Sequence, residues 1–199
     1  MVWGIAPSRI AKKASDYGSG PAILYLVNRS WVVCASERKW MAKKLSAGIL
    51  LYRQREGNVQ VFLVHPGGPF WAKRDDGAWS IPKGEYSDGD DPLVTAKREF
   101  FEETGFEVTG ACYPLSSLMQ PSGKVVSAWA VKGDLNAADV KSNTFALEWP
   151  PRSGKMQEFP EIDRGGWFDL STARTKLLPG QRGFLDQLQK FLAENQSEQ

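Results

Sequence analysis

Three carboxylates stand close together in the segment EFFEETGF, residues 99–106. They are Glu99, Glu102 and Glu103, and Arg98 directly precedes them. On a helix, residues three and four apart are neighbours with Cβ atoms about 5–6 Å apart, so these three side chains would crowd one edge. Like charges repel, and the negative end of a helix dipole adds to the repulsion. A divalent cation would relieve it, and hard oxygen ligands select Mg²⁺, Mn²⁺ or Ca²⁺.

The alternative interpretation is a solvated helix face, on which Lys97 and Arg98 balance the glutamates, because charge runs usually face water. The spacing around the cluster favours the cation site. Gly84 is followed by five residues, then Asp90, then seven residues and the run REFFEETGF. This pattern resembles the Nudix box, G-x5-E-x7-R-E-U-x-E-E-x-G-U with U apolar. It departs from the box only where Asp90 replaces the glutamate.

The resemblance runs from about Leu45 to Leu192 and implies a fold and a reaction. The implied fold is α/β (α+β), with a mixed β-sheet sandwiched between α-helices. The implied reaction is cleavage of a nucleoside diphosphate linked to another moiety, with Mg²⁺ or Mn²⁺ as the cofactor. The segments SAGILLYR and WSIPKG resemble the branch that holds diadenosine tetraphosphate hydrolases and small bacterial NTP pyrophosphohydrolases.

Other readings of the substrate stay open. Pro121 lies fifteen residues after Phe106, a spacing similar to that of ADP-ribose pyrophosphatases, which would make the substrate ADP-ribose or a nucleotide sugar. A Nudix module that senses nucleotides without hydrolysing them is another alternative. Such modules usually lose a box glutamate, whereas this chain keeps Glu99, Glu102 and Glu103, which favours catalysis.

By motif position, the resemblance implies that Glu102 and Glu103 bind the cations and that Glu99 completes their shell or orients the attacking water. Arg98 is expected to hold the glutamates in place by ion pairing. Gly84 is expected to let the backbone approach the metal and the phosphates, because glycine lacks a side chain.

Four residues outside these positions are further candidates. Glu161 precedes Trp167 at a distance similar to that of a glutamate in Nudix enzymes acting on diadenosine tetraphosphate, so it is a candidate general base; the alternative is an ordinary loop carboxylate. Lys83 either reaches a phosphate or is a solvated lysine. Phe70 and Trp71 either stack on the base of the substrate or cover the sheet.

The box needs a helix, and the residues that flank it supply both ends. Asp91 is a good N-cap acceptor and Pro92 suits the first helical position. We expect the helix to run to about Thr104 and to stop at Gly105, where glycine takes the left-handed conformation.

The remaining pattern predicts a mixed α/β domain around that helix. A closing amphipathic helix is expected over residues 180–195, with Phe184, Leu185 and Leu188 on its apolar stripe. Residues 134–165 are expected to form a long surface loop with a short helix. Strands are expected at residues 47–53 and 59–65, which a short turn joins, and at 79–82, 107–115, 124–133 and 166–170.

We expect the chain to divide into a poorly defined N-terminal extension over residues 1–40, a domain resembling the Nudix family over 41–195 and a disordered tail over 196–199. The extension holds two β-prone runs, ILYLV and WVVCA, that suit one hairpin. Met41 reads as an alternative initiator, because a short basic lead and a strand follow it.

Composition narrows the function classes. The formal net charge of +2 is too small to indicate nucleic-acid binding. Only two cysteines are present, which favours a reducing, cytoplasmic location over a disulfide framework.

His65 is the single histidine, and one histidine excludes most histidine-based catalytic schemes. We expect His65 to be structural. The apolar run Ala22–Val27 is too short for a span of about 20 residues. We therefore expect a small nucleotide as partner, with no membrane and no nucleic acid, and a monomer or homodimer.

Overall fold

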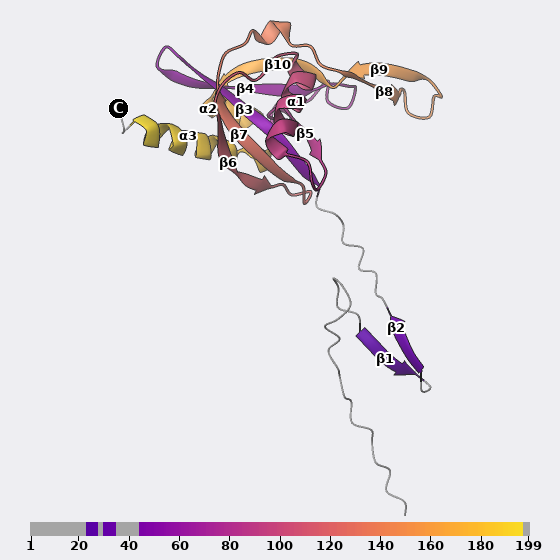
Figure 1. Ribbon diagram of the computed structural model, residues 1–199. Helices are drawn as coiled ribbons and strands as arrows, with labels where there is room; N and C mark the ends of the chain where they lie inside the picture. Colours follow the sequence, from indigo (N-terminus) through magenta and orange to yellow (C-terminus); the bar gives the residue numbers. More distant parts are fainter. Residues whose placement is uncertain (1–22, 28–29, 35–43, 197–199) are drawn as a thin grey trace, which may run out of the picture. The chain divides into compact units, whose positions relative to one another are not determined.

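The computed structural model describes residues 23–27, 30–34 and 44–196 (Figure 1). The chain separates into two compact units, residues 1–42 and 43–199, each considered by itself. In the first unit, β1 (Ile23–Val27) and β2 (Ser30–Cys34) pair as the antiparallel hairpin that the two β-prone runs predict. The predicted initiator Met41 and tail residues 197–199 lie outside the described residues.

The second unit is built on a mixed sheet with the strand order β10-β4-β3-β7-β6, and β5 pairs with the start of β3. The central strand β3 is antiparallel to β4 and parallel to β7. Its run of apolar residues is buried on both faces, as a central strand requires. The strands of this sheet are β3 (Leu45–Arg55), β4 (Asn58–Pro66), β5 (Lys83–Tyr86), β6 (Cys112–Met119), β7 (Val125–Lys132) and β10 (Ile162–Asp169).

Successive residues of a strand point to opposite faces of the sheet. Both faces of β3 therefore present apolar side chains, and helices cover both faces. On one face, α1 (Pro92–Thr104) buries Ala96 and Phe100 against Ile49 and its neighbours. On the other face, α2 (Leu170–Lys176) and α3 (Gly183–Gln196) pack on Leu50 and its neighbours. The predicted sandwich is thereby confirmed, and so is the apolar stripe of the closing helix.

The strand predicted at residues 79–82 is wrong. Trp79 and Ser80 form only isolated bridges, to Leu177 and Val64. The Pro82 carbonyl then accepts a hydrogen bond from the Ile49 N–H at 3.0 Å. The segment therefore crosses from β4 to β3 rather than running along either, and the regular strand is β5, four residues further on. The strand predicted at 107–115 likewise begins only at Cys112 and runs on to Met119.

Residues 134–165 are not a long loop. They contain the expected short helix, η1 (Ala137–Asp139), followed by a hairpin of β8 (Thr144–Glu148) and β9 (Met156–Pro160). This hairpin projects from the rest of its unit (Figure 1). Two of the prolines in this segment, Pro150 and Pro151, lie in the turn between the two strands, whereas most of its charged residues lie outside that turn. In the described part of the chain, no helix has the length and hydropathy that a membrane span needs.

Candidate active site

The box lies on a strand, a turn and a helix that follow one another in the chain. β5 pairs with β3 so that Gly84 faces Ala47. The turn after β5 is closed by Asp90, whose Oδ2 accepts a hydrogen bond from the Ser87 N–H at 2.8 Å. The helix α1 then begins at its N-cap Asp91 and ends at Gly105, which takes the left-handed conformation with φ 79°. Both predicted helix ends are confirmed.

Glu99 lies directly against Gly84. A Cβ atom at position 84 would come within 1.8 Å of the Glu99 carboxyl carbon, so only glycine leaves room for this carboxylate. Burial raises the pKa of Glu99, and the adjacent Arg98 opposes that rise. The glycine of the box therefore lets the helix bring a carboxylate onto the backbone of β5.

Arg98 joins two of the three glutamates. Its Nη2 lies 2.5 Å from Glu99 Oε1, and its Nη1 lies 2.9 Å from both carboxylate oxygens of Glu102. These contacts are the ion pairs that the box resemblance implied, and they raise the pKa of Arg98. Half of the Arg98 side chain is exposed, so the guanidinium sits at the surface of the cluster.

Glu103 points to a different neighbour. Its Oε2 accepts a hydrogen bond from the backbone N–H of Lys83 at 3.0 Å. Burial raises the pKa of this carboxyl to about 7, although the charge of Lys83 opposes the rise. Burial also lowers the pKa of the Lys83 ammonium, and Glu103 opposes that shift. The backbone of Lys83 therefore bonds one box glutamate, and the charges of Glu103 and Glu99 act on its ammonium.

Glu161 comes to the cluster from the link between β9 and β10. Its charge acts on both Glu99 and Glu103 and contributes to the raised pKa of each. Its backbone is fixed on both sides: the Gly67 N–H donates to its carbonyl at 2.8 Å, and its own N–H donates to the Asn143 carbonyl at 2.8 Å. The fold thus places a fourth carboxylate beside the box, 58 positions after Glu103 in the chain.

The chemistry of these donors fits a divalent cation. Glu99, Glu102, Glu103 and Glu161 offer only carboxylate oxygens, which Mg²⁺ and Mn²⁺ prefer, and their charges oppose one another where they stand. Among the described residues, no three His, Cys, Asp or Glu side chains are gathered around one point. Two contacts account for this, since Arg98 holds Glu99 and Glu102, and the Lys83 backbone holds Glu103. Binding one cation through three of these carboxylates would require the side chains to move.

Phe70 and Trp71 do not form one aromatic surface. Phe70 is 61% exposed, and its ring meets that of Trp149 at a centroid distance of 5.3 Å. Trp71 is half-buried and lies under the guanidinium of Arg74, 5.4 Å from the ring centroid. The sequence alone paired the two neighbours, whereas the structure pairs Phe70 with a residue of the β8–β9 hairpin.

His65 has the structural role expected of it. The ring is fully buried, with Nδ1 2.8 Å from Asp163 Oδ1 and Nε2 2.7 Å from the Arg74 carbonyl. Both nitrogens are therefore engaged, one with β10 and the other with the loop after β4. Sequence reasoning missed another buried anchor, Gln181, whose Oε1 accepts a hydrogen bond from the Ile81 N–H at 3.0 Å. This contact fixes the segment that leads into Lys83.

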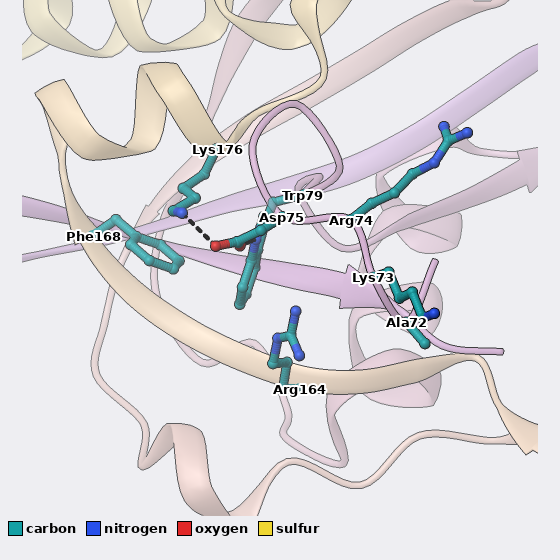
Figure 2. A pocket seen from close by; sticks show the side chains of 8 residues that line it. All are labelled: Ala72, Lys73, Arg74, Asp75, Trp79, Arg164, Phe168 and Lys176. Atoms are coloured by element: carbon teal, nitrogen blue, oxygen red, sulfur yellow. Dashed lines mark hydrogen bonds and ion pairs between the residues drawn. The ribbon is translucent and has the colours of Figure 1, made fainter. Parts of the chain in front are cut away.

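A pocket of about 520 Å³ lies on the face of the sheet that α2 and α3 cover. Its charges are partly satisfied within the fold, because Lys176 Nζ lies 2.7 Å from Asp75 Oδ2 and 2.8 Å from Asp76 Oδ1. Figure 2 shows Lys176 directed at Asp75 and Arg74 directed away from them. The sheet separates this pocket from the box glutamates. It is lined by Ala72, Lys73, Arg74, Asp75, Trp79, Arg164, Phe168 and Lys176.

Comparison with known proteins gives a family match over most of the chain. The model of the NUDIX domain matches residues 42–188. An RNA pyrophosphohydrolase of Caulobacter vibrioides is 40% identical over 57 residues, which cover 26% of this chain and 33% of that protein. A nucleoside triphosphate pyrophosphatase/Nudix hydrolase fusion protein of Bifidobacterium longum is 38% identical over 76 residues, 37% of this chain and 15% of that protein. These matches span a third or less of the relatives' lengths.

Solved structures share the fold at lower identity. An Ap4A hydrolase of C. elegans, in a binary complex, aligns with a TM-score of 0.53 and 22% identity over 76% of this chain and 98% of that one. The NUDIX domain of Shewanella oneidensis NrtR, complexed with ADP ribose, aligns with a TM-score of 0.54 and 14% identity. That alignment covers 78% of this chain and 92% of the other.

Proposed function

This chain belongs to the Nudix family, and from that premise we propose that it is a divalent-metal-dependent pyrophosphohydrolase. Its substrate would be a nucleoside diphosphate linked to another moiety, either a dinucleoside polyphosphate such as diadenosine tetraphosphate or a nucleoside triphosphate. The observation that carries the proposal is that α1 places two box carboxylates at β5, Glu99 against Gly84 and Glu103 on the Lys83 N–H, where the charge of Glu161 also acts on both.

In this proposal Glu99, Glu102 and Glu103 hold Mg²⁺ or Mn²⁺, which would neutralise phosphate oxygens and acidify a bound water. Arg98 keeps Glu99 and Glu102 in place through its ion pairs. Gly84 leaves the space that the Glu99 carboxylate fills. The chain's own part in the reaction is therefore to present three oxygen ligands on α1 and to seat two of them against β5.

Hydrolysis of a phosphoric anhydride forms one P–O bond to water and breaks one P–O bond to the leaving phosphate, and the water loses a proton. A carboxylate must accept that proton. Glu161 is our candidate, because it stands beside the metal-binding carboxylates without an ion-pair partner among the contacts of the described residues. Lys83 is our candidate for binding a phosphate of the substrate, because it is a cationic residue next to Gly84 and its backbone N–H bonds Glu103.

The test is a panel of dinucleoside polyphosphates, nucleoside triphosphates, ADP-ribose, a nucleotide sugar and a 5′-triphosphate RNA, assayed with Mg²⁺ and Mn²⁺. We expect hydrolysis that needs the added metal, with the highest kcat/KM on a dinucleoside polyphosphate or a nucleoside triphosphate. A preference for ADP-ribose or a nucleotide sugar would correct the substrate class. Binding of nucleotides without hydrolysis of any member would overturn the proposal in favour of a sensing module.

A further inference from the structure

One exposed aromatic feature of the second unit is the pair Phe70 and Trp149. Phenylalanine is usually buried, yet 61% of Phe70 is exposed. Its ring and that of Trp149 are nearly perpendicular, at 83°. Two rings in this arrangement form a corner, in which a flat ligand can lie on the face of one ring while its edge touches the other.

The loop that carries Phe70 is joined to the candidate catalytic carboxylates by consecutive backbone hydrogen bonds, whereas Trp149 stands at the other end of β8 from Asn143. The Asn143 N–H donates to the Glu102 carbonyl at 3.1 Å, and the Asn143 carbonyl accepts from the Glu161 N–H at 2.8 Å. The Glu161 carbonyl in turn accepts from the Gly67 N–H at 2.8 Å. Phe70 follows Gly67 by three residues, within about 10 Å of chain. The end of α1, the base of the β8–β9 hairpin and the Phe70 loop therefore meet at one junction.

The loop and the hairpin hold each other tightly enough to fix the corner. A Cβ atom on Gly67 would come within 2.0 Å of the Pro160 carbonyl oxygen, and one on Gly68 would lie 3.1 Å from Phe145 Cζ. On the hairpin, the Trp149 N–H donates to the Lys155 carbonyl at 2.9 Å. Both aromatic residues therefore stand on backbone that is packed or hydrogen-bonded, so little ordering is needed on binding.

We propose that Phe70 and Trp149 bind the base of the nucleotide substrate by stacking, while its phosphates extend to the box glutamates. This inference rests on the proposed function, because the loop that carries Phe70 is hydrogen-bonded at Gly67 to Glu161, where the phosphates of the proposed substrate would lie. Every nucleobase has a flat π-face, so an aromatic ring can stack on any of the bases. Phe70 is the stacking surface, and Trp149 both orients that ring and contacts the edge of the base.

Steady-state kinetics on substrates that have a nucleobase and on one that lacks it test the proposal. Phe70→Ala and Phe70→Leu should each raise KM for a nucleoside triphosphate or a dinucleoside tetraphosphate by about ten- to hundredfold, the factor that loss of one stacked base represents. Trp149→Ala should raise it by a similar factor. The kcat values should stay close to those of the wild type. Hydrolysis of inorganic tripolyphosphate, which has no base, should be unchanged in all three variants.

Two controls accompany these variants. Phe70→Tyr keeps an aromatic face and should keep the wild-type KM. Met119→Ala removes another exposed apolar side chain, 66% exposed on β6, and should have no effect. The proposal is overturned if Phe70→Leu leaves the KM for the nucleotide unchanged. It is also overturned if Phe70→Leu raises the KM for tripolyphosphate and the KM for the nucleotide by the same factor.

Equilibrium binding separates this inference from the proposed function. ATP and tripolyphosphate are titrated onto the Glu103→Gln protein and onto Glu103→Gln with Phe70→Leu, with tryptophan fluorescence as the readout. We expect ATP to bind the first protein at least about tenfold more tightly than the second, as loss of stacking predicts, and tripolyphosphate to bind both alike. An inert wild-type enzyme with this binding pattern would refute hydrolysis and leave the base site standing. Equal ATP binding by both proteins would refute the base site alone.

Discussion

The glutamates of α1 lie next to one another in sequence but have different environments. Glu99 and Glu102 share Arg98, whereas Glu103 is bonded to the backbone of Lys83. At Glu103 the effect of burial on the pKa outweighs the opposing charge of Lys83, and the pKa rises to about 7. We infer that Glu103 is the residue whose charge depends most on whether a cation is bound.

Replacing Glu103 by glutamine is the sharpest single test of the metal site. Glu103→Gln keeps the shape and the acceptor for Lys83 but removes one charge, so turnover should fall several hundredfold, or about 3–4 kcal/mol, as for other electrostatic elements of a preorganised site. Added Mg²⁺ should raise the melting temperature of the wild type more than that of the variant, because a ligand of the folded state stabilises it. The matched control is Glu107→Gln, an exposed glutamate just beyond the helix, which should change neither. Unchanged hydrolysis and an unchanged Mg²⁺ response in Glu103→Gln would mean that the three glutamates are a solvated face.

The same residue should make the stability of the metal-free protein depend on pH. A carboxyl whose pKa rises from 4.5 to about 7 on folding binds its proton more tightly in the folded state. The associated stability is present below pH 4.5 and is lost as the pH rises through 7. In EDTA, the wild type should therefore lose about 2–3 kcal/mol relative to Glu103→Gln between pH 4.5 and 8. Denaturant unfolding at several pH values measures this difference, and parallel curves for the two proteins would contradict it.

Asp90 replaces the glutamate of the box, and its contact suggests why a shorter side chain is tolerated. Its carboxylate closes the turn before α1 by accepting from the Ser87 N–H, away from Glu99 and Glu103. Asp90→Glu should therefore change kcat/KM by less than tenfold, or about 1.4 kcal/mol. Steady-state kinetics decide this, and a hundredfold change in either direction would place the residue at the reacting centre.

At the scale of elements, the contact between α1 and β5 sets the geometry of the site. α1 is amphipathic and buries Ala96 and Phe100 against the sheet, so its orientation is fixed by packing. That packing carries Glu99 onto Gly84. The β8–β9 hairpin and the Phe70 loop then attach to the same region through Glu161.

The closeness of α1 and β5 predicts the effect of a single methyl group. In Gly84→Ala the new Cβ would meet the Glu99 carboxyl carbon at 1.8 Å, so the carboxylate must leave its position. Turnover should fall at least tenfold, while stability falls by only about 1–3 kcal/mol, the usual cost of overpacking. Circular dichroism and thermal unfolding establish that the variant is folded. A folded variant with wild-type turnover would show that this placement of Glu99 does not matter for the reaction.

At the scale of the whole molecule, the candidate site and the pocket of Figure 2 use opposite faces of one sheet. The residues proposed to act lie between positions 70 and 161, all within the second unit. The family match also begins only at residue 42. We therefore propose that the first forty residues take no part in the reaction.

A chain that begins at Met41 tests that division. It should fold, with a melting temperature close to that of the full chain, and should keep kcat and KM within about threefold, well under the tenfold that 1.4 kcal/mol represents. The measurements are thermal unfolding and the substrate assay, with the full chain as reference. Insolubility or loss of activity would mean that the extension supports the Nudix domain.

The sequence by itself determined the features that depend on neighbouring residues. The spacing from Gly84 to Gly105 identified the family, and Asp91 and Gly105 marked both ends of α1, because capping and helix periodicity are local properties. The mixed α/β class followed from the pattern of strands and helices, and the resemblance to the Nudix family implied the sandwich. The strand predicted at residues 79–82 failed because the chain there passes from β4 to β3, which only the pairing of distant strands reveals.

Only the tertiary structure decided which distant residues meet. Glu161 reaches the box because β10 pairs with β4, and Trp149 reaches Phe70 because residues 144–160 form a hairpin rather than a loop. Glu103 has a raised pKa, unlike a solvated glutamate, because the fold removes water from it. Burial and long-range pairing are properties of the packed chain, so the sequence pattern named Glu161 only as a candidate and could not predict the Phe70–Trp149 contact or the burial of Glu103.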